Sequence, residues 1–540
     1  MSNNKNKYLV QGTILAVSSI IVRFIGLLYR IPLTRIVGDT GMGYYTSAFE
    51  IYNLALILSS YSIPVAVSKL VSAREIRKEY RNSKRVFITA IYIAAVVGGL
   101  MSLIIYFGAN VWASLVKAPN IAIPLKVLAP TIFVFAIMGV LRGLFQGKNT
   151  MLPTAISQVL EQIVNAVVSI VAAYLLMKEH NASPEISAYG AAGGTLGTFI
   201  GAVCGLAFLL FIYSLYRPVL NKRLLKDKAL HQESYKEVAV AFAYTVFPII
   251  LSQTVYQLSG TLDNVIFGQI MSTKNYATEE VVTMWGIYGN KYKMLTTVPV
   301  AIASAFGTSI VPALAASYAK NDYDGLRHKT ATSVKLNMLI AFPAAVGLTV
   351  LAKPIILVIF NNTNLDLSVK LLQIGSIAVV FFALSTLTNG VLQGIDKLHL
   401  PVIHAAISLG VHVVILFVLL KVFDLGANGL VIGNITFALL VCILNWISIG
   451  KHMQYKQEVI KTFVIPAIAA IIMGGITFFA YKIIYKILPS TVISLALSIV
   501  IAVAVYGVLI IIMKAVEEEE ILEMPMGARI VRLCKKIHLL

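Results

Sequence analysis

The chain has 540 residues, of which 58% are hydrophobic and only 13% are charged, and its mean hydropathy is +0.84. A soluble chain of this length carries about twice that charged fraction, so the composition excludes a set of water-soluble domains. The formal net charge of +20 does not indicate a nucleic-acid partner, because lysine and arginine collect in the cytoplasmic loops of membrane proteins.

Apolar runs of about 20 residues recur along the chain, each long enough to cross ~30 Å of hydrocarbon as a helix. They lack the alternation of barrel strands and are too long for them, so the pattern predicts an all-α integral membrane protein with fourteen transmembrane helices. The sixth span begins in a glycine-rich run, and the eighth carries two lysines. The expected spans are 9–34, 44–72, 86–113, 121–147, 153–177, 187–215, 238–270, 281–318, 332–359, 369–394, 399–421, 426–449, 461–486 and 491–514.

Positive charge is concentrated in loops that follow even-numbered spans. The loop after the second span, 73–85, and the loop after the sixth, 216–237, are both rich in lysine and arginine, whereas loops after odd-numbered spans are poorer. Basic loops mark the cytoplasmic side of a cell membrane, so both termini are expected in the cytoplasm. The first residues are interpreted as a cytoplasmic tail because no cleavage-site pattern follows the first apolar run.

The last segment, 516–540, is expected to form a cytoplasmic amphipathic tail. Ile530, Leu533, Cys534 and Ile537 fall at helical spacing, and basic residues lie away from that stripe. Such a helix lies on an anionic membrane surface. A membrane anchor is therefore predicted, with a regulatory or partner site as the alternative.

A short glycine-framed motif occurs twice, at an offset of 247 to 248 residues. The same offset relates Pro64, near the end of the second span, to Pro312, near the end of the eighth. Glycine permits tight backbone, so the motif is interpreted as a turn between adjacent spans, with a gating hinge as the alternative. The motif residues are Gly143, Gln146 and Gly147 in the first copy and Gly390, Gln393 and Gly394 in the second.

The repeat predicts how the chain is organised. An even number of spans separates the two copies, so they share one orientation, and two six-helix halves related by an axis along the membrane normal are expected to enclose a cavity. The expected parts are an N-terminal half at 1–216, a cytoplasmic linker at 217–237, a C-terminal half at 238–450, appended helices thirteen and fourteen at 451–515, and the tail at 516–540.

Cationic side chains inside the spans are the first candidates for substrate binding, because a charge in a span is costly. Arg23 and Arg30 are seven residues apart on nearly one face of the first span, and Lys291 and Lys293 lie in the eighth. Arginine binds phosphates through two parallel hydrogen bonds, so these cations are expected to hold an anion such as a diphosphate in the cavity. The alternative for Arg30 is contact with the outer headgroups.

Uncharged polar and acidic residues form two further candidate sets. Gln158, Glu161, Gln162 and Asn165 follow helical spacing in span five, and they either make interhelical hydrogen bonds or line the cavity. Asp263 is expected either to pair with a cation or to bind a coupling proton or sodium ion. The other ion-coupling candidates are Gln257 in span seven and Glu50 in span two.

No motif for chemistry is present. The chain has no Walker phosphate loop and no HExxH, and Cys204, Cys442 and Cys534 lie far apart without metal-ligand spacing. We therefore expect no enzyme activity, no metal and no cofactor, with H⁺, Na⁺ or the membrane potential as the energy source.

Four stretches resemble the bacterial polysaccharide-biosynthesis flippases, including the lipid II flippase and stage V sporulation protein B-like branches. They are LVQGTILAVSSIIVRFIGLLYRIPLTRIVG, IPVAVSKLVSAR, LRGLFQGKNTMLPTAISQVLEQIV and AFGTSIVPALAASYA. The family belongs to the superfamily that includes multidrug and toxic-compound extruders. The resemblance implies twelve core helices plus two, alternating access, and export of an undecaprenyl-diphosphate-linked sugar precursor.

The resemblance also implies roles for particular residues. Lipid II flippases carry cavity arginines in spans one, two and eight. Arg23 matches the inner position of span one, Tyr29 with Arg30 beside it falls at the outer position, and Lys291 approximates the position in span eight. Span two offers no matching arginine, whereas Asp263 resembles an acidic residue in span seven of the Gram-positive branch.

The sequence thus predicts a monomeric flippase of the cell membrane, whose partners are membrane lipids and a lipid-linked oligosaccharide, most simply lipid II for peptidoglycan synthesis. A flippase for teichoic-acid or capsular-polysaccharide units is the first alternative. An ion-coupled multidrug extruder is the second.

Overall fold

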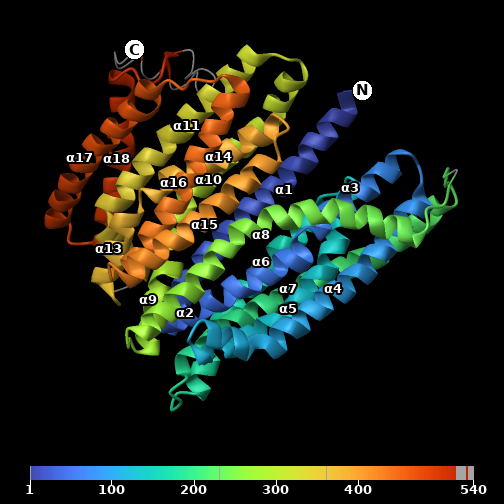
Figure 1. Cartoon of the computed structure of the whole chain (residues 1–540), viewed down its shortest axis with the longest axis horizontal. Coiled ribbons are helices and arrows are strands. Elements are labelled where there is room, and N and C mark those ends of the chain that lie inside the picture. The colour runs from blue at the N-terminus through green and yellow to red at the C-terminus, as the bar shows by residue number, and fades with distance from the viewer. Residues whose placement is uncertain (1, 230, 361, 519–530, 533–534, 536–540) are drawn as a thin grey trace. The chain divides into compact units, whose positions relative to one another are not determined.

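The computed structural model describes residues 2–229, 231–360, 362–518, 531–532 and 535, and these residues form helices without a strand (Figure 1). Within them, ten helices are long and apolar enough to cross a membrane, or up to twelve if each bent helix pair is one span. The predicted all-α, multi-pass membrane fold is confirmed at this level. Each of the fourteen predicted ranges overlaps a helix, but the number fourteen stays a prediction.

Helix contacts divide the chain into two compact units, 1–286 and 287–540. The α-helices of the first unit are α1 (Ser2–Leu28), α2 (Arg30–Leu56), α3 (Ile63–Ile76), α4 (Tyr80–Leu115), α5 (Ala122–Gly147), α6 (Leu152–Glu179), α7 (Ile186–Leu224), α8 (Tyr235–Thr273) and α9 (Thr278–Gly286). Those of the second are α10 (Lys293–Ala319), α11 (Tyr323–Val350), α12 (Ala352–Phe360), α13 (Leu365–Gly375), α14 (Ala378–Gly394), α15 (His399–Lys421), α16 (Ala427–Met453), α17 (Ile465–Ile487) and α18 (Thr491–Ile512).

The helices are interrupted at several points, and at Gly38 the sequence supplies the reason. In α2 the backbone leaves the helical region at Gly38, whose φ of 73° is open to glycine but costly for other residues. This break falls in the loop expected between the first two spans. A π-helical segment, Ile57–Tyr61, separates α2 from α3, and another, Ile287–Tyr292, precedes α10. Such segments are frequent at functional sites.

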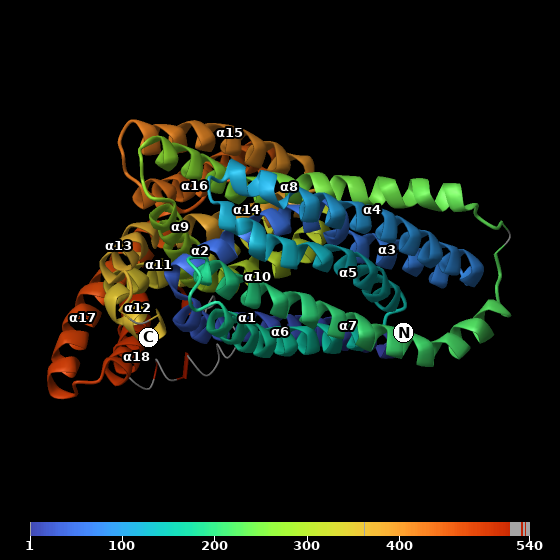
Figure 2. The same ribbon diagram turned by 90° about the horizontal axis from the view of Figure 1, so that it is seen from below.

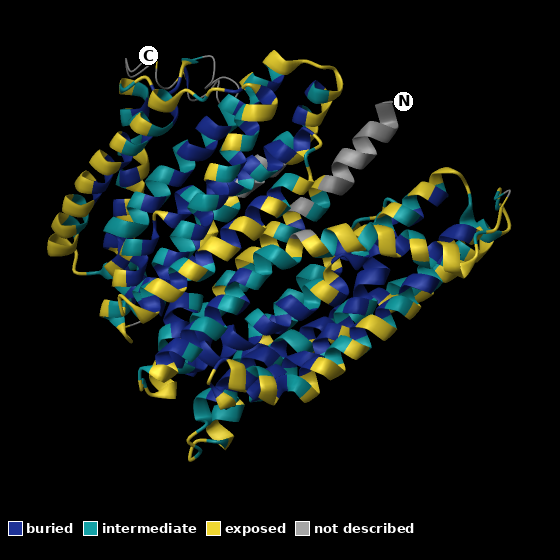
Figure 3. Ribbon diagram, viewed as in Figure 1, coloured by how far each residue is buried: buried dark blue, intermediate teal, exposed yellow. Residues whose placement is uncertain are grey.

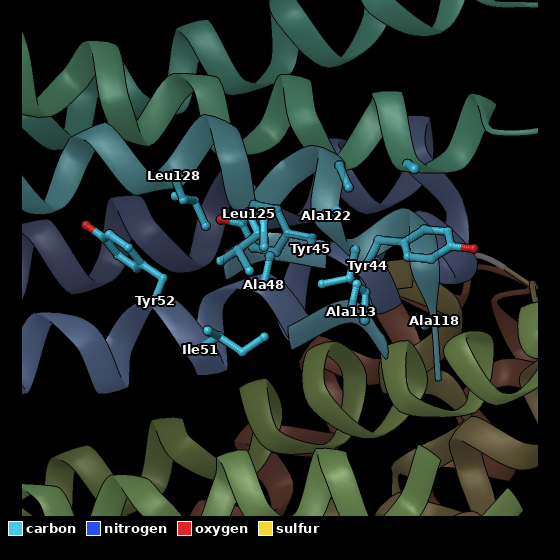
Figure 4. Close-up of a cluster of buried hydrophobic side chains, with 14 of the residues drawn as sticks. Tyr44, Tyr45, Ala48, Ile51, Tyr52, Ala113, Ala118, Ala122, Leu125 and Leu128 are labelled. Atoms are coloured by element: carbon cyan, nitrogen blue, oxygen red, sulfur yellow. The ribbon is translucent and has the colours of Figure 1, made fainter. Parts of the chain in front are cut away.

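The core of the first unit lies around α5, the helix with the most buried residues in that unit (Figure 3). Tyr45 and Ala48 of α2 pack against Leu125 and Leu128 of α5 (Figure 4). These side chains are almost completely buried. The apolar face of α5 therefore holds α2 in place, and α2 carries two of the candidate site residues, Arg30 and Glu50.

The most extensive contact between described helices of this unit joins α6 and α7 through glycines four residues apart. A Cβ atom at Gly193 would lie 2.4 Å from the Cα of Ala173, and one at Gly197 would lie 2.1 Å from the Oγ of Ser169. A Cβ at Gly201 would lie 2.6 Å from the backbone oxygen of Glu161. Small residues at this spacing let two membrane helices approach backbone to backbone.

The repeated motif is helical, so the predicted position of the turn is wrong. Gly143 and Gly147 lie inside the last turns of α5, and the chain reverses after them at Asn149, whose φ is 57°. A Cβ at Gly143 would lie 2.7 Å from the backbone oxygen of Pro64, and one at Gly147 would lie 2.8 Å from the Cβ of Val71. The glycines thus make room for α3 rather than for a tight backbone turn.

The second copy behaves in the same way within its own unit. Gly394 ends α14, and Asp396 follows with a φ of 60°. A Cβ at Gly394 would lie 2.8 Å from the Cβ of Leu314 on α10. The glycine motif therefore packs against the proline-containing helix in both units. In the first unit this is the helix of Pro64, and in the second it is the helix of Pro312.

The remaining helices of the second unit include α17 and α18, which pack side by side (Figure 2). Val531 of the C-terminal segment is buried in a cluster with Ala469 and Ile510 of this pair, and Lys535 forms an ion pair with Glu518 at 2.6 Å. The residues of the predicted amphipathic stripe, Ile530, Leu533, Cys534 and Ile537, lie outside the described residues.

Candidate functional site

One member of the predicted span-five stripe, Glu161 on α6, forms an ion pair within the first unit. Its carboxylate accepts a hydrogen bond from Arg142 on α5 at 2.7 Å, and Arg142 also donates to the hydroxyl of Ser157 at 3.1 Å. Only 8% of the Arg142 surface is exposed. An antiparallel α5–α6 pair with a short connection places these residues opposite each other, so the two charges neutralise one another inside the helix bundle.

The other members of the span-five stripe divide between neighbouring helices. Asn165 accepts hydrogen bonds from Ser169 at 2.9 Å and from Thr198 of α7 at 3.4 Å, so it takes the interhelical alternative. Gln162 lies on the α1 side, with its Nε2 3.2 Å from the position of a Cβ on Gly26. The Oε1 of Gln158 is buried with no hydrogen-bond partner among the described residues.

The three ion-coupling candidates lie on α2 and α8 of the same unit. Glu50 accepts a hydrogen bond from Gln257 at 2.9 Å, and a Cβ on Gly260 would lie 2.4 Å from its Oε2. Asp263 is only 1% exposed. Asn264 accepts a hydrogen bond from Ser47 at 3.4 Å, which extends the polar contact between the two helices.

The two predicted cations of the first span have different surroundings. Arg23 is exposed on α1, next to the exposed Phe24. Arg30 begins α2, and its guanidinium carbon lies 5.8 Å from the centre of the Tyr45 ring. The Tyr45 hydroxyl in turn makes a 2.9 Å hydrogen bond with that of Tyr29. A charged group exposed within an apolar helix is costly in lipid and favours a water-filled space.

The two lysines of the second unit are held by local contacts. Lys291 is completely buried in the π-helical segment, and its ammonium group donates to the backbone oxygen of Thr363 at 2.7 Å. The ammonium group of Lys293 lies 4.9 Å from the centre of the Tyr288 ring. The expected binding role of Lys291 stays a prediction, and it requires the ammonium group to leave Thr363.

Two histidines of α15 are buried and hydrogen-bonded. His404 contacts the side-chain oxygen of Asn445 at 2.7 Å and the hydroxyl of Ser448 at 3.1 Å. His412 contacts the backbone oxygen of Gly433 at 2.9 Å. These contacts stabilise the α15–α16 pair.

Comparison with known protein families shows which family the chain belongs to. The description of the polysaccharide biosynthesis protein family matches residues 9–318, more than half of the chain. The chain belongs to this family. The MatE family description matches residues 248–418.

Two proteins similar to this chain come from Bacillus subtilis. Lipid II flippase MurJ is 25% identical over 481 residues, which cover 86% of this chain and 87% of that protein. Stage V sporulation protein B is 24% identical over 528 residues, covering 98% of this chain and 99% of that protein.

Solved structures share the fold. Lipid II flippase MurJ in its inward closed conformation has a TM-score of 0.67 at 14% identity, covering 92% of this chain and 98% of that one. An inward-facing multidrug resistance MATE family transporter of the MOP superfamily has a TM-score of 0.63 at 16% identity, covering 79% of this chain and 95% of that one. At these identities the likeness shows the fold alone.

Sequence reasoning missed Arg142 and the hydrogen bond between Tyr29 and Tyr45. Arg142 is a charge inside a predicted span, which is the signal that singled out Arg23. Tyr29 and Tyr45 carry no such signal, because tyrosine is common in membrane helices and near their ends. Gly260 was also missed, since its role appears only when the Glu50 carboxylate lies against it.

Proposed function

We propose that this protein is a flippase that exports an undecaprenyl-diphosphate-linked sugar precursor across the cytoplasmic membrane by alternating access. The observation that supports this best is the exposed cation Arg23 in an apolar helix, together with family membership over most of the chain. Lipid II is the proposed substrate because a relative that covers most of both chains is a lipid II flippase.

The proposed binding group for the diphosphate is Arg23, assisted by Arg30. A guanidinium group forms two parallel hydrogen bonds with a phosphate, and an exposed one is available without breaking an existing contact. Lys291 and Lys293 are proposed to join when their contacts with Thr363 and Tyr288 open. Gln158, with its unpartnered buried oxygen, is the proposed polar contact from α6.

The proposed architecture follows the sequence repeat. It has fourteen spans, two six-helix halves at 1–216 and 238–450, and both termini in the cytoplasm of a monomer. The packing of the glycine motif on the proline-containing helix in each unit supports equivalent halves. The glycine motif, including Gln146 and Gln393, is proposed as a packing contact that also defines where each half can bend.

Replacing Arg23 by alanine is expected to abolish function with normal protein levels. The assay is growth of a strain depleted of its own lipid II flippase and expressing the variant. Arg77→Ala, an exposed arginine at the end of α3, is the matched control and is expected to support growth. Arg23→Lys is expected to support weaker growth, because lysine keeps the charge but not the paired hydrogen bonds. Full growth of the Arg23→Ala strain would overturn the proposal for this residue.

Asp263 is the proposed coupling residue, through H⁺ or Na⁺. Asp263→Asn is expected to remove the dependence of transport on an imposed proton or sodium gradient in vesicles, while the variant still binds the lipid-linked substrate. Asp396→Asn, in an exposed loop, is the control and should behave as wild type. A gradient response that survives in Asp263→Asn would remove this residue from the coupling mechanism.

A multidrug extruder is the second candidate function, and the match of the MatE family description to residues 248–418 favours it. Overexpression that raises drug resistance without rescuing the flippase-depleted strain would support the extruder. Rescue without resistance would support the flippase.

A further inference from the structure

A cationic cavity lies in the first unit, at the ends of α4, α5 and α7. Its volume is about 320 Å³. The cavity is lined by both charged and apolar side chains, among them Lys84, Phe87, Lys148, Tyr213, Arg217 and Arg223. It involves none of the residues assigned above to substrate binding or ion coupling.

The position of this cavity follows from the two most basic loops of the first half. The amide of Lys228 donates to the backbone oxygen of Lys78 at 3.0 Å, and the amide of Arg81 donates to Asp227 at 2.9 Å. Arg74 binds Glu233 at 2.5 Å. The structure therefore brings the loop after α3 and the loop after α7 together, on the side of the membrane where basic residues are expected.

Two of the cations around the cavity are already engaged by one shared carboxylate. The ammonium group of Lys148 is paired with one oxygen of Glu75, and Arg223 contacts the other oxygen at 3.3 Å. Ser83 also donates to Glu75 at 3.0 Å. Burial lowers the pKa of Lys148, and the contact with Glu75 opposes this change. These side chains are held by their contacts with Glu75, so they line the cavity but are not available to bind a ligand.

Lys84 and Arg217 differ from these side chains because both are exposed, and neither forms an ion pair with another described residue. They extend from α4 and α7, so their charge is available at the mouth of the cavity. The apolar side is formed by Phe87 and Tyr213, whose ring centres are 5.2 Å apart, and by the nearly buried Leu144. The cavity thus presents an apolar wall beside uncompensated positive charge.

We propose that this cavity binds the phosphodiester headgroup of an anionic phospholipid from the surrounding membrane. Lys84 and Arg217 bind the phosphate, and Phe87 and Tyr213 contact the first carbons of the lipid. An apolar wall next to two cations fits a molecule that joins a phosphate to hydrocarbon. A free phosphate ion shares the anionic chemistry but gains nothing from the aromatic wall. The site is independent of the transported substrate.

The test is a lipid titration of the purified full-length protein in detergent, measured by native mass spectrometry. Phosphatidylglycerol is compared with the zwitterionic phosphatidylethanolamine and with inorganic phosphate. The variant is Lys84→Gln with Arg217→Gln. Each basic residue near an anionic lipid surface contributes roughly fivefold to affinity, so the double variant is expected to bind phosphatidylglycerol about 25-fold more weakly.

Lys222→Gln with Lys226→Gln is the matched control, because it removes the same charge from exposed positions near the same helix end that do not line the cavity. This control is expected to bind phosphatidylglycerol as the wild type does. Equal losses in both double variants would show a general charge effect and overturn the site. Equal binding of the two lipids by the wild type would also overturn it.

Competition by inorganic phosphate distinguishes the source of the anion. If phosphate binds the wild type as tightly as phosphatidylglycerol, the ligand is a free anion and the assignment to lipid is wrong. Growth of the flippase-depleted strain is scored separately. Lys84 and Arg217 lie outside the proposed substrate site. A Lys84→Gln, Arg217→Gln variant that loses lipid binding but still supports growth would therefore support the lipid site in this cavity. The growth of the Arg23→Ala strain tests the proposed function and does not change that conclusion.

Discussion

Replacing Arg142 by methionine is expected to destabilise the protein by about 3–5 kcal/mol, because it leaves the Glu161 carboxylate without its partner inside the helix bundle. The thermal midpoint of the purified protein in detergent should fall clearly below that of the wild type. Arg77→Met, an exposed arginine of the same unit, is the control and should change stability by no more than about 0.5 kcal/mol.

The double variant Arg142→Met with Glu161→Leu separates charge from packing. Replacing a buried ion pair by apolar residues of similar size is often neutral or stabilising, so the double variant is expected to recover most of the midpoint that the single variant loses. A single variant as stable as the wild type would mean that the pair does not hold α5 and α6 together. A double variant as unstable as the single one would point to packing by the Arg142 stem instead.

Replacing Gly197 by alanine is the second change with a large expected effect. The new Cβ would lie 2.1 Å from the Ser169 hydroxyl, 2.5 Å from the Ser169 nitrogen and 2.6 Å from the Asn165 backbone oxygen. Backbone atoms cannot turn aside as a flexible side chain does, so α6 and α7 must separate. Overpacking of this kind costs about 1–3 kcal/mol or more, and the thermal midpoint is the measurement.

Gly99→Ala on α4 is the matched control for this second change. Its Cβ would meet only the ring of Phe133, at an ordinary 3.7 Å. Alanine is the better helix former, so this variant should be as stable as the wild type or slightly more stable. If both alanine variants have the wild-type midpoint, the close approach of α6 and α7 does not exist in the membrane protein.

The fold could be predicted from the sequence because long apolar runs have few alternatives in lipid. A span of about 20 apolar residues must satisfy its own backbone, and every predicted range does overlap a helix. The interruption at Gly38 and the π-helical segments Ile57–Tyr61 and Ile287–Tyr292 were not predicted, because the hydrophobicity of the chain does not change where the helical pitch changes locally.

The candidate site was harder to predict, because polar residues in a span have several possible partners. The spacing of Glu161 and Asn165 showed that they share a helix face, but not that the neighbours are Arg142 and Ser169. Likewise, the glycine motif was recognisable as a repeat, but the atoms that require glycine belong to Pro64 and Val67, about 80 residues earlier in the chain. Which residues on other helices they contact depends on the tertiary structure and cannot be deduced from the spacing within one helix.

The glycine contact between α6 and α7 has a consequence for how motion in this protein can be measured. Two helices that touch through their backbones have no layer of side chains that can slide or change rotamer between them, so they are expected to move as one rigid rod. Spectroscopic labels on the outer faces of α6 and α7 should keep a constant separation throughout a transport cycle. That distance can serve as a constant reference against which the movements of other helices are measured.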